Sequence, residues 1–433
     1  MKNFIHSIIK LTLAASTCFL WSPLYADSLI EKLQDISSIS DLRTLESKDK
    51  LEKLVCNIEQ RLDWDNEAAS HFKQRIIVKH RGFDKPTVMV TEGYGAAYAL
   101  SPSYQEELST LLDANLVFVE HRYFLESTPK PCNWDYLTVE NSAGDYHHIR
   151  ESLGRVYSGK WFTTGISKGG QTTLFYRTFY PEDVDGSVAY VAPLNKSLED
   201  GRHQPFLKGI KQKEACEAVK NFQLEVLKRR KTIQPLFEAY CQKKGYSFRV
   251  PMNEVYDLTA LEYEFAFWQW GDDYKKIPSH EAPDSVFCKF LVKACEPDYF
   301  SPASANTPFN VQAMREIGYY GYDTKPFKDL LTIKHTEGYM RRTMIPDSLT
   351  YIEFDTNLYE KVNHFLDEED CPMIFIYGEN DPWTASGVTW LREKDKKEMH
   401  VFIDPEGSHR ARIRTMPEET QKEIMSILKN WIR

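Results

Sequence analysis

The sequence predicts an α/β fold in which a mostly parallel sheet is flanked by helices and interrupted by a large, mainly helical insertion. Three observations support this prediction. Short apolar runs rich in β-branched residues alternate with helical patterns in the first half of the chain. The alternation stops over residues 197–347, where helical patterns dominate, and it resumes afterwards. Apolar strands that alternate with helices are typical of parallel sheets covered on both faces.

The predicted strands are short, and most end at glycine or another turn-forming residue. They cover residues 75–81, 87–91, 115–119, 161–164, 187–191, 373–377 and 400–403. Helical patterns cover residues 104–112, 172–180, 216–230 and 418–431. Pro181 directly follows the second of these helices and is a stop signal, because proline cannot continue a helix.

The first 26 residues are predicted to be a signal peptide. Lys2 and Lys10 accompany an apolar stretch at 11–20, and the small residue Ala26 ends the segment. The apolar stretch is too short to span a bilayer comfortably. We therefore expect a secreted or periplasmic protein; a lipid anchor at Cys18 and an ordinary N-terminal core helix are the alternatives.

After the signal peptide, we expect a sheet domain formed by residues 27–196 and 348–433, with residues 197–347 as a helical cap. The net charge of −9 is made of interspersed acidic and basic residues without a basic block. An acidic chain of this kind is poorly suited to polyanions, so nucleic-acid binding is not expected. No second apolar run is long enough to insert stably in a membrane.

Seven cysteines remain after the signal peptide, and four of them fall between residues 216 and 295. An exported protein can form disulfides, so we expect bridges in this segment, although an odd count leaves at least one thiol free. No pair has the C-x-x-C spacing of a structural zinc site.

The best candidate for a nucleophile is Ser167, in the motif Gly165-Ile166-Ser167-Lys168-Gly169. This is the G-x-S-x-G elbow, in which a serine on a sharp turn between a strand and a helix projects its hydroxyl from the sheet. Glycines leave room for the close approach of strand and helix. The motif lies between a predicted strand and a predicted helix, and it therefore indicates the α/β-hydrolase fold.

This fold orders its catalytic residues as serine, acid and histidine. Asp381 follows the strand at 373–377, and His409 follows the last predicted strand in a turn of small residues. We predict that His409 is the base and that Asp381 orients it. Glu379 and Asp404 are the competing acids.

The oxyanion hole of this fold uses the backbone N–H of the residue after the nucleophile and one N–H from an earlier strand–helix loop. The first donor is therefore predicted to be Lys168. The loop Gly93-Tyr94-Gly95 follows the strand at 87–91, and Tyr94 is the predicted second donor, although an ordinary turn remains the alternative interpretation of these glycines.

Four motifs in this order resemble the secreted bacterial serine tripeptidyl aminopeptidases and, more distantly, lysosomal Pro-Xaa carboxypeptidase and its dipeptidyl peptidase relatives. They are Thr91-Glu92-Gly93-Tyr94, Val119-Glu120-His121-Arg122-Tyr123-Phe124, the elbow with its following Gly170, and Asp381-Pro382-Trp383. The resemblance implies a serine exopeptidase that acts on short peptides under a cap, with no metal or cofactor.

An aminopeptidase must hold a cationic amine at a fixed distance from its serine, and a buried carboxylate suits this task. Glu264 is our first candidate and Glu262 the second, with Trp268 and Trp270 as candidates for an apolar or proline-accepting subsite. These residues could equally be cap core and solvated surface. For Glu120 and Arg122 we favour a structural role as a buried ion pair that supports the site.

Two other functions fit the same residues. One is an esterase, lipase or thioesterase with the same Ser-Asp-His triad. The other is a catalytically inactive hydrolase fold that serves only for binding.

Overall fold

A computed structural model describes residues 28–433, so the predictions for the signal peptide and Cys18 lie outside the described residues. A single nine-stranded sheet has the order β1-β2-β3-β5-β4-β6-β7-β8-β9. Neighbours from β5 onward in this order are parallel, whereas β1, β2, β3 and β5 pair antiparallel. The strands are β1 (Ile39–Leu45), β2 (Glu52–Arg61), β3 (His71–His80), β4 (Thr87–Thr91), β5 (Asn115–Val119), β6 (Trp161–Ile166), β7 (Gly186–Tyr190), β8 (Met373–Gly378) and β9 (Met399–Asp404).

The seven strands predicted from the sequence correspond to β3–β9, and the predicted α/β fold with a mostly parallel sheet is confirmed. Strands β1 and β2 were not predicted. β1 is an edge strand with few buried positions, so it carries no clear apolar run. β2 mixes charged residues into a mostly buried strand, which hides its periodicity.

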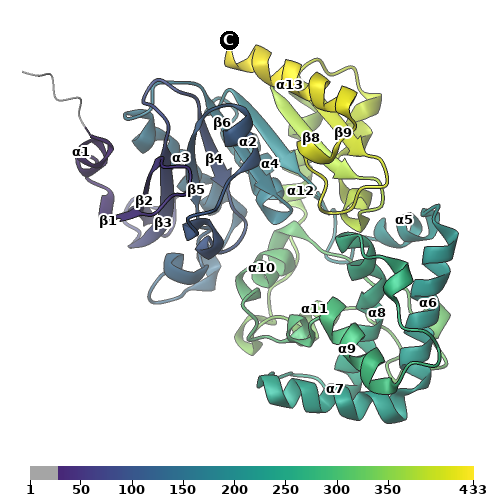
Figure 1. Ribbon diagram of the computed structural model, residues 1–433. Coiled ribbons are helices and arrows are strands. Elements are labelled where there is room, and N and C mark those ends of the chain that lie inside the picture. The colour runs from purple at the N-terminus through teal and green to yellow at the C-terminus, as the bar shows by residue number, and fades with distance from the viewer. Residues whose placement is uncertain (1–27) are drawn as a thin grey trace, which may run out of the picture.

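Helices cover both faces of the sheet (Figure 1). On one face, Ile149 of α3 (Val139–Gly154) and Tyr176 of α4 (Lys168–Phe179) share an apolar core with Val117 of β5. On the other face, Leu428 of α13 (Glu418–Ile432) shares a core with Ile374 of β8. The helices of the sheet domain are α1 (Leu29–Gln34), α2 (Glu107–Leu111), α3 (Val139–Gly154), α4 (Lys168–Phe179), α12 (Asn357–Glu368) and α13 (Glu418–Ile432).

The chain between β7 and β8 is helical, and it forms the lower right part of the molecule in Figure 1. The helices here are α5 (His203–Gly209), α6 (Lys213–Lys228), α7 (Arg230–Lys244), α8 (Met252–Trp270), α9 (Asp284–Ala294), α10 (Thr307–Gln312) and α11 (Tyr339–Thr343). We call this region the cap. Its apolar core is continuous with one face of the sheet, because Leu174 and Phe375 belong to the same buried cluster as Phe265 and Val255.

Helix α8, with 19 residues, runs through the middle of the cap and is buried along most of its length. It carries the charged residues Asp257 and Glu262 among its apolar ones. Across residues 28–433, no helix combines the length and the apolar character needed to cross a membrane.

The disulfides expected between residues 216 and 295 are not formed, because all seven cysteines of the described chain are free thiols. Cys241, Cys288 and Cys295 lie in the apolar core of the cap. Buried thiols pack as small apolar groups, which explains their presence without a bridge. Burial also raises the pKa of the Cys288 thiol to about 11, which makes it unreactive at neutral pH.

Candidate active site

Ser167 stands on a strained turn between β6 and α4. Its backbone angles are φ 59° and ψ −120°, a region that residues with a side chain rarely adopt. The Ser167 N–H donates to the Tyr190 carbonyl at 2.9 Å, which ties the turn to β7. A Cβ on Gly165 would lie 2.2 Å from the Gly169 carbonyl oxygen, so the turn requires glycine there. The turn therefore has the geometry of a nucleophile elbow.

His409 and Asp381 form a buried pair at the same edge of the sheet. The His409 Nδ1 lies 2.7 Å from Asp381 Oδ2, and the two side chains are 4% and 0% exposed. The other Asp381 oxygen accepts a hydrogen bond from the Trp383 N–H at 3.1 Å. This pairing places the proton on Nδ1 and leaves His409 Nε2 as the acceptor. Nε2 is buried and has no hydrogen-bond partner among residues 28–433.

The two competing acids point elsewhere. Glu379 is bonded to the Glu406 N–H at 3.0 Å and to Lys211 at 3.3 Å. Asp404 accepts a hydrogen bond of 2.5 Å from the Thr415 hydroxyl. Of the three acids considered from the sequence, only Asp381 contacts His409.

The loop that carries Tyr94 packs against the start of α4, where Lys168 lies. The N–H of Lys168 begins α4, and Tyr94 lines the same cavity as Ser167. The intervening loop is packed tightly on the elbow, since a Cβ on Gly93 would come within 2.6 Å of Lys168 Cγ and 2.8 Å of the Gly169 nitrogen. Glycine at position 93 is therefore needed for this close approach. The choice of Lys168 and Tyr94 as donors stays a prediction.

Ser167 and His409 line one cavity of about 620 Å³ between the sheet domain and the cap. The sheet side contributes Glu92 and Tyr94, and the cap side contributes Glu262, Gln269 and Trp270. Further aromatic walls come from Tyr98, Tyr299, Phe300, Phe309, Tyr319 and Trp383. A space of this size, lined by aromatic side chains together with polar and charged groups, suits a short peptide.

Glu262 and Trp270 line this cavity, but Glu264 and Trp268 do not. Residues two apart on a helix point about 200° away from each other, so only one of each pair can face the cavity. Glu264 lines a separate hollow with Lys208 and Asp323. Trp268 is 4% exposed and packs in the cap core. The order of preference from the sequence, Glu264 before Glu262, is therefore reversed.

Glu120 and Arg122 are buried, but they do not pair with each other. Glu120 forms an ion pair with Arg75 and also accepts a hydrogen bond from the Ala96 N–H at 2.8 Å. Arg122 binds both carboxylate oxygens of Asp145 at 2.7 Å. β5 ends at Val119, so both residues lie beyond the strand, and the predicted pair between them is not formed. Each residue instead fixes a different loop beside the site.

Glu92 is a cavity residue that the sequence interpretation included in a motif but gave no role. It is 6% exposed and accepts a hydrogen bond from the Tyr98 hydroxyl at 2.7 Å. Burial raises the pKa of Glu92 to about 7. Only its place directly before the Gly93-Tyr94-Gly95 loop could have indicated this position.

The family model described as PS-10 peptidase S37 matches residues 28–432. The prolyl tri/tetrapeptidyl aminopeptidase of Streptomyces mobaraensis is 29% identical over 392 residues, covering 87% of this chain and 79% of that protein. The lysosomal Pro-X carboxypeptidase of Homo sapiens is 28% identical over 139 residues, covering 28% of each protein. The peroxisomal α/β-hydrolase Lpx1 of Saccharomyces cerevisiae aligns over 89% of this chain and 90% of its own, with 11% identity and a TM-score of 0.41.

The family match covers nearly all of the described chain, and it agrees with the resemblance inferred from the sequence motifs. The chain belongs to the PS-10 peptidase S37 family and is a serine peptidase with an α/β-hydrolase fold.

Proposed function

We propose that the protein is an exported aminopeptidase that releases three-residue peptides from free amino termini, with Ser167, His409 and Asp381 as its catalytic triad. Ser167 Oγ attacks the scissile carbonyl carbon while His409 Nε2 takes the hydroxyl proton. The resulting imidazolium is held by Asp381 and returns the proton to the leaving amine. A water molecule then hydrolyses the acyl-enzyme by the same route.

The observation that carries the aminopeptidase assignment is the environment of Glu262. Its carboxylate faces the cavity, is 7% exposed and accepts hydrogen bonds from Tyr320 at 2.9 Å and Tyr322 at 2.7 Å. It forms no ion pair with any residue from 28 to 433. A buried carboxylate without a cationic partner is costly unless a ligand supplies the positive charge. The amine of a peptide substrate supplies it here.

The spacing along α8 supports a three-residue product. Glu262, Ala266 and Gln269 lie on one face of the helix and all line the cavity. The Gln269 carbonyl accepts a hydrogen bond from the His409 N–H at 2.9 Å, so this end of the helix marks the catalytic side. Seven residues of helix span about 10 Å, and three residues of extended peptide also span about 10 Å.

The aromatic walls near Ser167 suit a proline at the cleaved bond, because its rigid ring offers apolar faces for stacking. Phe309, Tyr319 and Trp383 supply such surfaces in the cavity. The curated relative from Streptomyces mobaraensis is named for prolyl peptides. We infer the same preference for this chain.

The function is tested with p-nitroanilides of one, two and three residues, each with and without an N-terminal acetyl group. Only free-amine three-residue substrates should be cleaved rapidly, and Ser167→Ala should abolish cleavage. Glu262→Gln, which keeps the shape and removes the charge, should raise KM strongly for those substrates. Hydrolysis of p-nitrophenyl esters without cleavage of any anilide would instead identify an esterase. Absence of both, with no labelling by a fluorophosphonate, would identify a binding protein.

Export is part of the proposal and has its own test. The sequence predicts cleavage after Ala26, so the mature chain should begin at Asp27. Mass spectrometry of the protein recovered outside the cytoplasm should find this terminus. A diacylated chain that begins at Cys18 would show the lipid-anchored alternative.

A further inference from the structure

Lys168 has a second feature besides the backbone N–H that follows Ser167. Its side chain runs under the Gly93 loop, since a Cβ on Gly93 would lie 2.7 Å from Lys168 Cβ. Its ammonium then lies 5.9 Å from the ring centroids of both Tyr94 and Phe124. The whole residue is 3% exposed. The charge is therefore held in the protein interior beside the rings of Tyr94 and Phe124.

No carboxylate neutralises this ammonium within ion-pair distance in the described chain. Glu92 and Glu316 are the acids that raise its pKa. Glu92 is bonded to Tyr98 at 2.7 Å, and Glu316 accepts the Val139 N–H at 2.7 Å, where it caps α3. A buried cation without a direct partner costs several kcal/mol, so its retention points to a use.

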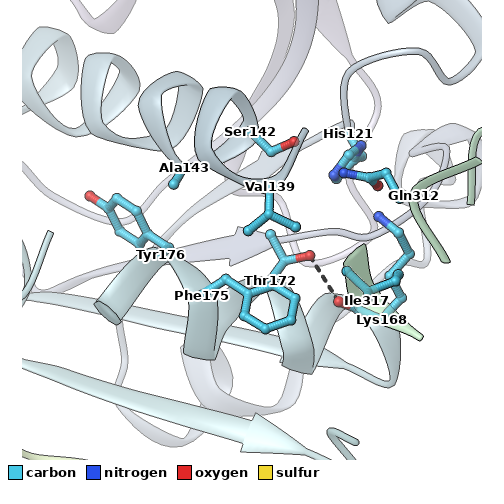
Figure 2. Close-up of a pocket in the computed structure, with 10 residues that line it drawn as sticks. All are labelled: His121, Val139, Ser142, Ala143, Lys168, Thr172, Phe175, Tyr176, Gln312 and Ile317. Carbon is cyan, nitrogen blue, oxygen red and sulfur yellow. Dashed lines mark hydrogen bonds between the residues drawn. The ribbon is translucent and has the colours of Figure 1, made fainter. Parts of the chain in front are cut away.

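The ammonium points into a small internal cavity between the sheet domain and the cap. Figure 2 shows the Lys168 nitrogen directed toward His121 and Gln312, on the opposite side from Tyr176. The cavity of about 10 Å³ is close to the smallest space that holds one water molecule. Gln312, at the end of α10, is 1% exposed and its Oε1 is a buried acceptor without a partner in residues 28–433. A water there would accept from Lys168 and donate to Gln312.

We propose that the Lys168 side chain is a positioning residue of the acyl-transfer site, whose buried positive charge, held in place by Gln312 of the cap, stabilises the oxyanion bound at its own backbone N–H. This inference rests on the proposed function, because it takes Ser167 as the nucleophile and the Lys168 N–H as a donor. The ammonium is joined by its own side chain to the predicted donor N–H and lies beside the Tyr94 ring of the second predicted donor. A buried charge held there acts on the oxyanion through the low-dielectric interior of the protein and strengthens the hole. It also makes a cap residue part of the reaction.

If the Lys168 charge assists the reaction, kcat should depend on pH through the ionisation of Lys168. Burial lowers the pKa of Lys168 to about 7, so the charged form is present below that pH and is lost as the pH rises. Burial and the Lys168 charge together hold the pKa of His121 well below its usual range, so His121 is neutral. The titratable groups that face Lys168 from the surrounding elements are Glu92, Tyr94, His121, Tyr176 and Glu316.

The test follows kcat against pH with p-nitrophenyl acetate, whose hydrolysis needs the oxyanion site but no amine-binding group. Lys168→Met should lower kcat roughly tenfold or more, with KM little changed, and should remove the alkaline decline of kcat. Gln312→Glu places a carboxylate beside the ammonium and should move that decline to higher pH by about one unit. Ile317→Val alters the apolar wall of the same cavity and should leave the decline in place.

Two results would overturn the inference. One is a Lys168→Met enzyme whose kcat stays close to that of the wild type. The other is an alkaline decline that Gln312→Glu does not move, and this arm decides the question if Lys168→Met does not fold. If the protein proves not to be a tripeptidyl aminopeptidase, both experiments can still be interpreted. Hydrolysis of p-nitrophenyl acetate does not depend on how a peptide binds. Ester hydrolysis that survives Ser167→Ala would overturn the inference together with the catalytic assignment on which it rests.

Discussion

The backbone carbonyl of Gln269, at the end of α8 in the cap, accepts a hydrogen bond of 2.9 Å from the backbone N–H of His409. Gly271 of the cap and Ser408 of the His409 loop are also in close contact, because a Cβ on Gly271 would lie 2.8 Å from the Ser408 hydroxyl oxygen. The cap therefore holds the loop that carries the proposed base. The helix that we propose binds the substrate amine through Glu262 therefore also contacts the loop of the proposed base.

Gly271→Ala should separate this catalytic coupling from an ordinary loss of stability. Gly271 has φ 65°, so alanine costs about 1 kcal/mol of stability, and the new Cβ also presses on Ser408. We expect kcat to fall as the His409 loop shifts. Gly245→Ala is the matched control, because Gly245 ends α7 with φ 74° and has nothing within 4 Å of its Cβ. Both variants should unfold at lower urea concentration, but only Gly271→Ala should lose activity. Equal activity in both would show that the loop tolerates movement.

Asp381→Asn should lower kcat by roughly three to four orders of magnitude, since an amide at this position favours the wrong tautomer of His409. The fold should be unchanged, because asparagine keeps the shape of the side chain. Glu379→Gln serves as the control, since Glu379 is bonded to Lys211 and the Glu406 N–H rather than to His409. Steady-state kinetics of both variants is measured on the same anilide. A larger loss of kcat in Glu379→Gln than in Asp381→Asn would contradict the assignment of Asp381 as the acid.

The binding of free-amine peptides should depend on the ionisation of Glu262. Burial raises the pKa of Glu262 to about 7, so its carboxyl is neutral below that pH and charged above it. A cationic amine is bound by the charged form, so KM for a free-amine tripeptide anilide should fall as the pH rises through about 7. Glu262→Gln should have a high KM that no longer depends on pH in this way.

The reference for this experiment is a p-nitrophenyl ester, which shares Ser167 and His409 with the peptide but needs no amine-binding group. Its KM should show no comparable change with pH in either enzyme. A fall in KM that persists in Glu262→Gln would assign the amine site to another carboxylate, with Glu92 the first to examine because it lines the same cavity.

Removing one partner of the buried pair Arg122–Asp145 should be strongly destabilising. Both side chains are almost fully buried, and the guanidinium also donates to the carbonyls of Leu62 and Tyr136 at 2.9 Å. Arg122→Met leaves Asp145 as an unpaired buried charge, which should cost about 3–5 kcal/mol of unfolding free energy. Urea denaturation measures this loss. Adding Asp145→Leu should recover part of it, and a strictly additive double variant would contradict direct coupling.

Much of the fold was predictable because buried parallel strands appear in the sequence as short apolar runs. The order of Ser167, Asp381 and His409 after successive strands was predictable for the same reason, since the carboxyl ends of parallel strands meet at one edge of a sheet. The edge strand β1 was not predictable, because half-exposed strands carry too few apolar residues. The break at Arg229 between α6 and α7 also leaves no clear signal in the sequence.

The details of the site depend on which way side chains point and on which distant segments meet, and neither can be read from a local sequence pattern. Glu262 and Glu264 are the same residue type, two positions apart in the sequence. Only the orientation of α8 about its axis decides which of them faces the cavity. Glu120 and Arg122 bind different partners because β5 ends at Val119, before both residues. Gln312 lies 144 residues beyond Lys168 in the chain, and only folding of the cap brings the two together.

The most direct test of the central claim is mass spectrometry of the products from an unlabelled peptide of about ten residues with a free amino terminus and proline at its third position. The first three residues should be released as the initial product, together with an unlabelled remainder that begins at residue four. Ser167→Ala should release nothing, and acetylation of the terminus should block the reaction. Initial release of single residues, cleavage from the carboxyl end, or equal cleavage of the acetylated peptide would contradict the proposed function.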